Sequence, residues 1–226
     1  MSKDLFHFGA RKTRIWPDAQ RVERLAEPSV IITDFSDRDI YHSRLRDRIL
    51  QLEQGSEFRD SIFKAGCGVK VRHPARWSCV EADLVHARAM ALFRLVYQSP
   101  TAVVDDSWAS VYRKGDYCAP HSHTRVIASV LYLLDPGEPP EPDDPVAGRF
   151  CFGDPRMRVC CPEQAGRMTR HLMPELLPGT MMIFPAEFIH HVNPYLGTKP
   201  RITMSWNIAR EPIAGKPGAL ERPSLA

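Results

Sequence analysis

Long apolar runs and blocks of basic charge are both missing from this sequence of 226 residues. No stretch reaches the length of a membrane-spanning helix, and residues 1–18 carry charges and Pro17 in place of the apolar segment of a secretory signal. We therefore expect a cytoplasmic protein with no membrane partner. The formal net charge is only +3 and no polybasic block occurs, so nucleic acid is not expected as a partner either.

Cysteine is present, but without the spacing of a metal or disulfide motif. No two of the six cysteines form a CxxC pair, and the adjacent Cys160 and Cys161 suit neither a zinc knuckle nor an ordinary disulfide framework. Internal repeats of solenoid period are absent as well, which excludes a repeat architecture. We interpret all six cysteines as free thiols: Cys67, Cys79, Cys118, Cys151, Cys160 and Cys161.

The remaining composition is that of an ordinary folded domain, with 43% apolar and 25% charged residues. The length suits one domain with a sizeable core. We assign residues 1–100 to a helical and mixed flank that packs on this core, with a short strand at residues 30–32 and two helices after it. The helices are expected at about 37–54 and from Ser78 to Ser99, each starting at a capping-box pattern: Ser36 with Asp39, and Ser78 with Glu81.

From Thr101 onward the pattern changes to short β-rich runs separated by glycine and proline. Many short strands with turn signals are typical of a sandwich or barrel, so we assign residues 101–210 to a β core and 211–226 to a tail. The segment 135–145 is acidic and rich in proline, and we expect it to be a surface loop. The expected strands include 103–104, 108–113, 126–134, 149–152, 180–184 and 202–208.

The last of these strands has the clearest alternation. One face carries only polar side chains, from Arg201, Thr203, Ser205 and Asn207, and the other carries only Ile202, Met204, Trp206 and Ile208. A solvated sheet edge is one explanation. An exposed face usually carries lysine or glutamate, however, whereas an arginine followed by small hydroxyls and an amide favours the lining of a pocket for a carboxylate.

Three histidines in the same half of the chain suggest a metal centre. His121 and His123 are two residues apart, so on an extended segment both imidazoles point to one side and can reach one ion. His190 offers a distant third ligand. Three ligands on one side leave positions open for water, a cosubstrate or dioxygen, which indicates a catalytic rather than a structural site.

Each candidate ligand has an alternative role. His121 follows a proline and could be a turn residue, and His123 could ligate the metal, hydrogen-bond a substrate or face solvent. His190 and His191 are adjacent, so on a strand only one of them points toward a given metal. Asp154 could replace His123 as an acidic ligand, although an aspartate before proline is more typical of a turn.

Taken in order, these motifs resemble the signature of the 2-oxoglutarate- and Fe(II)-dependent oxygenases, specifically an HxH-containing group related to the prolyl-4-hydroxylase-like branch. The resemblance spans residues 108–208, nearly half of the chain. The segments that carry it are 112–117, 121–123, 131–133, 148–150, 154–156, 179–185, 190–194 and 201–203.

This resemblance implies a mainly β fold with flanking helices, built on a double-stranded β-helix, or jelly roll. It implies Fe(II) as the metal and 2-oxoglutarate as cosubstrate, which is converted to succinate and carbon dioxide while an unidentified substrate is hydroxylated. His121 matches the first iron ligand, His190 the distal histidine, and Arg201 the arginine that pairs with the far carboxylate of 2-oxoglutarate. Thr203 or Ser205 would support that carboxylate, and further hydroxyl donors are expected from Tyr112 and Tyr132.

One position departs from the family pattern. Two residues after the first histidine the family has aspartate or glutamate, and this chain has His123, so the third ligand is open. Two other classes of function therefore stay in play: a cupin-like three-histidine metalloenzyme that does not use 2-oxoglutarate, and a non-catalytic jelly-roll binding module. The substrate is left open between a small molecule and a peptide, and a homodimer is allowed.

Overall fold

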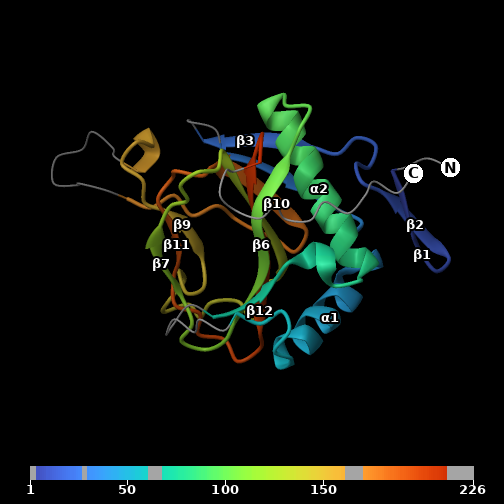
Figure 1. The fold of residues 1–226 in the computed structure, drawn as a ribbon. Coiled ribbons are helices and arrows are strands. Elements are labelled where there is room, and N and C mark those ends of the chain that lie inside the picture. Colours follow the sequence, from blue (N-terminus) through green and yellow to red (C-terminus); the bar gives the residue numbers. More distant parts are fainter. Residues whose placement is uncertain (1–3, 27–29, 61–67, 161–169, 213–226) are drawn as a thin grey trace.

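The computed structural model describes residues 4–26, 30–60, 68–160 and 170–212, and within them three layers are stacked (Figure 1). A seven-stranded sheet in the order β3-β4-β10-β8-β12-β6-β5 forms the middle layer. A three-stranded sheet, β7-β11-β9, lies on one side of it, and the helices α1 and α2 cover the other side. This is the expected double-stranded β-helix with flanking helices.

The bounds of the elements agree with the expected strands of the second half and add short ones that the sequence pattern did not predict. The middle sheet contains β3 (Val22–Ala26), β4 (Val30–Asp34), β5 (Val69–Arg72), β6 (Val103–Tyr112), β8 (Ala128–Asp135), β10 (Thr180–Pro185) and β12 (Arg201–Ala209). The smaller sheet contains β7 (Cys118–His121), β9 (Phe150–Phe152) and β11 (His190–Val192). A separate hairpin is formed by β1 (Leu5–Phe8) and β2 (Arg11–Arg14). The helices are α1 (His42–Gln54), α2 (Val80–Tyr97) and the single 3-10 turns η1 (Arg38–Ile40), η2 (Pro74–Arg76) and η3 (Arg158–Cys160).

Alternating side chains divide the interior into two cores. On β10, Met181 and Ile183 face the helices, whereas Met182 and Phe184 face the smaller sheet. Strand β12 follows the same rule: Ile202, Met204, Trp206 and Ile208 are buried under the helices. The polar side chains of β12 are thereby turned toward the space between the two sheets, as its alternation predicted.

The helix starts differ from the capping-box predictions, which were wrong. The residue before α1 is Tyr41 and the residue before α2 is Cys79, and neither helix has a side-chain cap. Asp37, near the start of α1, forms an ion pair with α2. Arg88 of α2 is fully buried and donates to both carboxylate oxygens of Asp37, at 2.9 and 2.5 Å. This ion pair links α2 to the segment before α1.

The first hundred residues do more than flank the β core, because β3, β4 and β5 extend the middle sheet at both edges. The assignment of separate regions at 1–100, 101–210 and 211–226 remains a prediction, and residues 213–226 lie outside the described part of the chain. Residues 136–149 contain no helix or strand, as expected of the loop after β8. Among the described helices, none combines the length and apolar character needed to cross a membrane.

Candidate metal and cosubstrate site

The smaller sheet brings the three predicted histidines together. His121 ends β7 and His190 begins β11, and the two residues are direct partners in the antiparallel pairing of these strands. His123 follows two residues after His121, and its backbone N–H donates to the carbonyl of Ala186 at 2.8 Å. One ligand atom from each of the three histidines lies within 4.8 Å of the others, which is the arrangement needed to share one ion.

Backbone carbonyls fix the tautomer of two of the histidines. Nδ1 of His121 lies 2.8 Å from the carbonyl of Ala119, and Nδ1 of His190 lies 2.7 Å from the carbonyl of Phe188. A carbonyl can only accept, so each Nδ1 carries the proton and each Nε2 keeps its lone pair. This is the arrangement of a metal-ligating histidine whose other nitrogen is held by the backbone.

Burial keeps the imidazoles of His123 and His190 neutral. The pKa of His190 is lowered to about 3, first by its burial and then by the neighbouring His121. The same two causes lower the pKa of His123 to about 4. Phe150 and Phe184 pack against the His190 ring, with centroids at 5.5 and 4.9 Å, and exclude water from it. At neutral pH both rings can therefore donate a lone pair to a metal.

Asn207, which the strand alternation placed on the polar face, also contacts the histidine group, a contact that the sequence did not predict. Its amide nitrogen lies 3.2 Å from Nδ1 of His123, and its oxygen accepts from the hydroxyl of Ser129 at 3.0 Å. Exchanging the amide oxygen and nitrogen preserves both contacts, because the hydroxyl can also accept. In the exchanged orientation Nδ1 of His123 donates to Asn207, and Nε2 of His123 becomes free for a metal.

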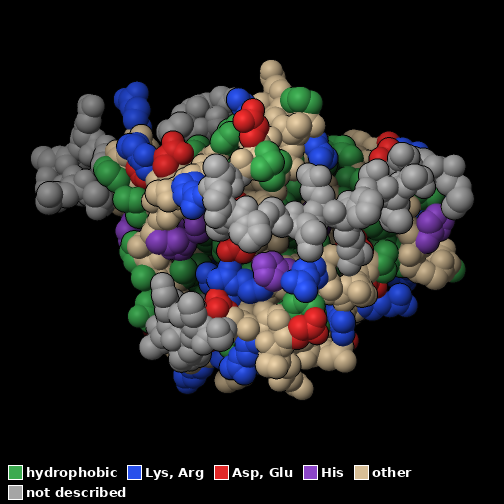
Figure 2. Space-filling model, in the orientation of Figure 1, with side chains coloured by type: hydrophobic (Ala, Val, Ile, Leu, Met, Phe, Trp, Pro, Cys, Tyr) green, Lys and Arg blue, Asp and Glu red, His purple; other side chains and the backbone are tan. Residues whose placement is uncertain are grey.

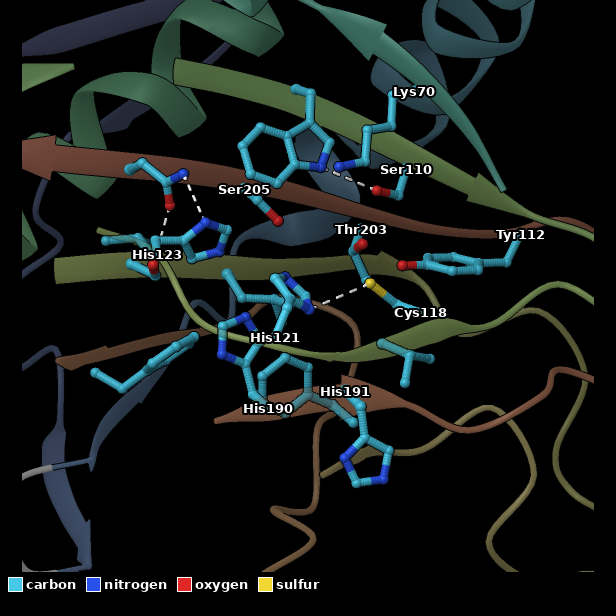
Figure 3. Close-up of a pocket in the computed structure, with 18 residues that line it drawn as sticks. Lys70, Ser110, Tyr112, Cys118, His121, His123, His190, His191, Thr203 and Ser205 are labelled. Carbon is cyan, nitrogen blue, oxygen red and sulfur yellow. Dashed lines mark hydrogen bonds between the residues drawn. The ribbon is translucent and has the colours of Figure 1, made fainter. Parts of the chain in front are cut away.

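A pocket between the sheets connects these histidines with the polar face of β12 (Figure 3). Thr203, Ser205 and Asn207 line it, as the strand alternation predicted, and Tyr112 lines it from β6. The lining residues without a signal in the sequence include Lys70, Trp108 and Cys118. Lys70 and Trp108 come from neighbouring strands, and the Lys70 ammonium lies 4.5 Å from the centre of the Trp108 ring.

Arg201 is a buried cation at one end of the polar face of β12. The residue is only 5% exposed, and its Nη1 atom is buried without a hydrogen-bond partner in the part of the chain that the structure describes. Its guanidinium lies 5.4 Å from the ring centre of Tyr112, the residue opposite it on β6 and part of the pocket lining. Burial lowers the pKa of Arg201. A buried guanidinium without a counterion is costly, so this end of the polar face suits a carboxylate from a bound molecule.

The prediction for Tyr132 was wrong. Its side chain is fully buried in the core beneath the helices, where its hydroxyl contacts Tyr41 at 2.7 Å and Nε2 of His42 at 2.5 Å. Its neighbour Leu131 is the residue of β8 that faces the pocket. Tyr132 thus points to the opposite side of the sheet and cannot donate to a ligand in the pocket.

Asp154 forms a turn, not a metal site. Its carboxylate accepts from the backbone N–H and the side chain of Arg156 and from the backbone N–H of Ile189, at 2.6–2.9 Å. It does not belong to the histidine group. Because Ile189 directly precedes His190, this turn fixes the start of β11. The hydrogen bonds from Arg156 are the main cause that lowers the pKa of Asp154 to about 2.

Replacing Asp154 with asparagine should destabilise the fold in a pH-dependent way. The folded-state pKa lies below the unfolded value of about 3.9, so the carboxylate stabilises the protein above that pH and loses this effect as pH falls toward 2. Because Arg156 is half exposed, solvent screening limits the loss at pH 7 to on the order of 1–2 kcal/mol. Urea unfolding at pH 7 and pH 3 measures it. The exposed Asp143→Asn variant is the control, and an Asp154→Asn defect equally large at both pH values would contradict this account.

All four described cysteines, Cys79, Cys118, Cys151 and Cys160, are free, in agreement with the interpretation of the sequence. Cys67 and Cys161 lie outside the described residues.

Comparison with known proteins indicates the family to which this site belongs. Residues 106–207 match the family described as "Putative 2OG-Fe(II) oxygenase", and this range covers the three histidines, the pocket-lining face of β12 and Arg201. This match makes residues 106–207 a 2OG-Fe(II) oxygenase region. The metal of this oxygenase is accordingly Fe(II) and its cosubstrate is 2-oxoglutarate, and the neutral imidazoles and the unpaired guanidinium fit both. No curated protein matches the sequence.

Solved structures support the fold of this oxygenase. AviO1 from Streptomyces viridochromogenes Tue57 is 14% identical, with a TM-score of 0.58 over 83% of this chain and 92% of that one. A 2OG-Fe(II) oxygenase family protein from Burkholderia pseudomallei is 13% identical, with a TM-score of 0.55 over 82% and 87% of the two chains. A prolyl-4-hydroxylase from Pseudomonas putida is 15% identical, with a TM-score of 0.51 over 80% and 88%. At these identities the likeness concerns the fold.

Proposed function

We propose that this oxygenase hydroxylates a C–H bond of a small-molecule or peptide substrate, with Fe(II) held by His121, His123 and His190 and 2-oxoglutarate held by Arg201. The buried, unpaired Nη1 of Arg201 is the observation that carries the proposal. It supplies the binding partner that a carboxylate cosubstrate requires, on the same strand face that lines the pocket beside the histidines. A three-histidine enzyme that uses no 2-oxoglutarate would not need the buried guanidinium of Arg201 for a cosubstrate.

The protein contributes ligands, orientation and exclusion of water. His121, His123 and His190 would hold the ion with their imidazoles, and the pocket that they line would leave room for the cosubstrate beside it. When bound, Fe(II) and 2-oxoglutarate supply the oxidising chemistry, in which dioxygen is consumed, succinate and carbon dioxide are released and the substrate gains a hydroxyl group. The backbone carbonyls of Ala119 and Phe188 hold two of the rings in the required tautomer, and Asn207 holds the third.

The cosubstrate lies along β12 in this proposal. Arg201 would pair with the far carboxylate of 2-oxoglutarate, which would leave the keto-acid end for the metal. Thr203, Ser205 and Tyr112 line the pocket, and their hydroxyl groups would donate to the bound molecule. Arg201 and Thr203 alternate with the buried Ile202, so their backbone is fixed by the sheet on both sides.

Several features support the proposed setting of the enzyme. Lysine and arginine side chains are interspersed with acidic ones on the face shown in Figure 2, which agrees with a partner other than nucleic acid or a membrane surface. Four free cysteines favour a cytoplasmic location, where thiols stay reduced. A homodimer stays a prediction, and light scattering of the purified protein measures it.

An anaerobic titration tests the proposal. Protein reconstituted with Fe(II) should develop the metal-to-ketoacid charge-transfer absorption on addition of 2-oxoglutarate, and admission of dioxygen should then yield succinate and carbon dioxide in equal amounts. Glutarate has both carboxylates but no keto oxygen, so it should compete for Arg201 without producing the absorption. If 2-oxoglutarate binds without this absorption, or is not consumed with dioxygen, the cupin-like alternative or the binding module is preferred. For any candidate substrate, labelled dioxygen should place its label in the new hydroxyl group.

A further inference from the structure

A second group of metal-binding side chains lies on the reverse side of β11. His190 and His191 are neighbours on this strand and therefore point to opposite sides, and Figure 3 shows the His191 ring turned away from His121 and His190. On its own side His191 meets Cys151 and His171. One ligand atom from each of these three residues lies within 4.8 Å of the others.

The fold brings the three residues together from distant segments. Cys151 of β9 is the direct partner of His191 in the pairing of β9 with β11. His171 is delivered by a short antiparallel bridge, in which Phe152 and Leu172 exchange two backbone hydrogen bonds of 2.8 and 2.9 Å. The rings of His171 and His191 lie 4.8 Å apart between centroids, at 75° to each other. The approach is close because Gly153 has no side chain: a Cβ there would lie 3.3 Å from the His171 ring.

A buried nitrogen without a partner points to a ligand at this place. His191 is 8% exposed, and its Nδ1 atom is buried with no hydrogen-bond partner among the described residues. Leaving a buried ring nitrogen unpaired costs free energy, and native structures seldom do so without a reason. A metal ion between the three side chains would satisfy it. His171 is exposed, so the ion has a path of entry from solvent.

The sulfur of Cys151 is held in position for such an ion. The residue is fully buried, and its Sγ atom accepts a contact from the amide nitrogen of Asn193 at 3.5 Å. Burial raises the pKa of the Cys151 thiol to about 11, so without a metal it carries its proton. Metal binding would replace that proton, form a metal–sulfur bond and release the proton to solvent.

We propose that Cys151, His171 and His191 form a second metal site, which binds Zn²⁺ and is separate from the iron site. One thiolate and two imidazoles are ligands that Zn²⁺ prefers, whereas iron is assigned to the three-histidine group on the other side of β11 from the family match. A tetrahedral ion would keep its fourth position for water on the exposed side, next to His171. The ion would tie β9, β11 and the segment at His171 together directly behind the iron ligand His190.

A cobalt titration distinguishes the two sites, because Co²⁺ replaces both metals and a thiolate ligand gives it an intense near-ultraviolet charge-transfer absorption. We expect the metal-free full-length protein to bind two equivalents of Co²⁺ under anaerobic conditions, with the thiolate absorption tracking one of them. In His171→Ala, whose changed side chain is exposed, the thiolate absorption should fall severalfold and one equivalent should be lost. Cys151→Ser should abolish the absorption altogether. His121→Ala should lose the other equivalent and keep the thiolate absorption.

Matched variants complete the test. Cys79→Ser removes a thiol of the core beneath the helices, and His7→Ala removes an exposed histidine of β1; both should retain two equivalents. The purified wild type should contain zinc as well as iron by elemental analysis, and His171→Ala should contain iron only. Absence of the thiolate absorption in the wild type, or its persistence in Cys151→Ser, would overturn the second site without affecting the iron site. A wild type that shows only the thiolate absorption would overturn the three-histidine assignment instead.

Discussion

Tight binding of Fe(II) should be lost when His121 or His190 is replaced by alanine. Each substitution removes one of three imidazoles whose ligand atoms lie within 4.8 Å of one another, and two monodentate ligands hold a divalent ion poorly. Since removal of an outer-shell partner alone typically costs about 10–100-fold in metal affinity, removal of a ligand should cost at least about a hundredfold. Iron stoichiometry after anaerobic reconstitution and gel filtration measures the loss.

The same experiment separates the third ligand from the first two. His123→Ala should also release iron, and Asn207→Ala should weaken binding by a smaller factor, because it removes only the contact that orients the His123 ring. The exposed His7→Ala variant controls for the general effect of losing a histidine. Circular dichroism should remain that of the wild type in every case. Full iron content in both His121→Ala and His190→Ala would refute the assignment of the site.

Replacing Arg201 with alanine should cripple cosubstrate binding while leaving the iron in place. The variant loses a charge-assisted bidentate contact to a carboxylate, and a loss of that kind costs on the order of 2–5 kcal/mol. Affinity for 2-oxoglutarate should therefore fall by well over tenfold. The charge-transfer absorption of the anaerobic Fe(II) protein, followed during titration with 2-oxoglutarate, measures the change directly.

Two further variants show whether the effect belongs to the guanidinium. Arg201→Lys keeps the charge but loses the planar fork, so its affinity should lie between those of the wild type and the alanine variant. Arg210→Ala changes an exposed arginine one residue beyond the end of β12 and should bind 2-oxoglutarate normally. Equal affinity of the wild type and Arg201→Ala would remove the main support for the proposed cosubstrate site, even if the iron content is unchanged.

The polar face of β12 could be predicted from the sequence because its two faces differ in chemistry. Arg201, Thr203 and Ser205 alternate with apolar residues, and only one arrangement of the strand buries the apolar set. Strand β8 has no such contrast. Its residues 130–134 are almost all apolar on both faces, so the sequence could not show that Tyr132 faces the helices and Leu131 the pocket.

The second group of candidate metal ligands could not be predicted from sequence patterns, for another reason. Metal motifs are recognised when the ligands are close in sequence, and Cys151, His171 and His191 are spaced by about twenty residues each. Cys151 and His191 meet because β9 pairs with β11, and His171 joins them because its neighbour Leu172 forms a bridge with Phe152 of β9. The interpretation of Cys151 as an ordinary free thiol followed from spacing alone, which carries no information on such long-range pairing.

The central position of β12 in the sheet affects how this enzyme folds during synthesis. Strand β12 pairs with β8 on one side and β6 on the other, yet it is the last strand of the described chain. Until residues 201–209 have emerged from the ribosome, β6 and β8 each have an edge without a partner strand. Such edges can associate with other chains. The sheet closes by inserting its final strand between strands made much earlier, a pairing of high sequence separation that slows folding. The strand that closes the sheet also brings in Arg201, so the nascent protein gains the arginine proposed to bind the cosubstrate in the same step that removes its exposed edges.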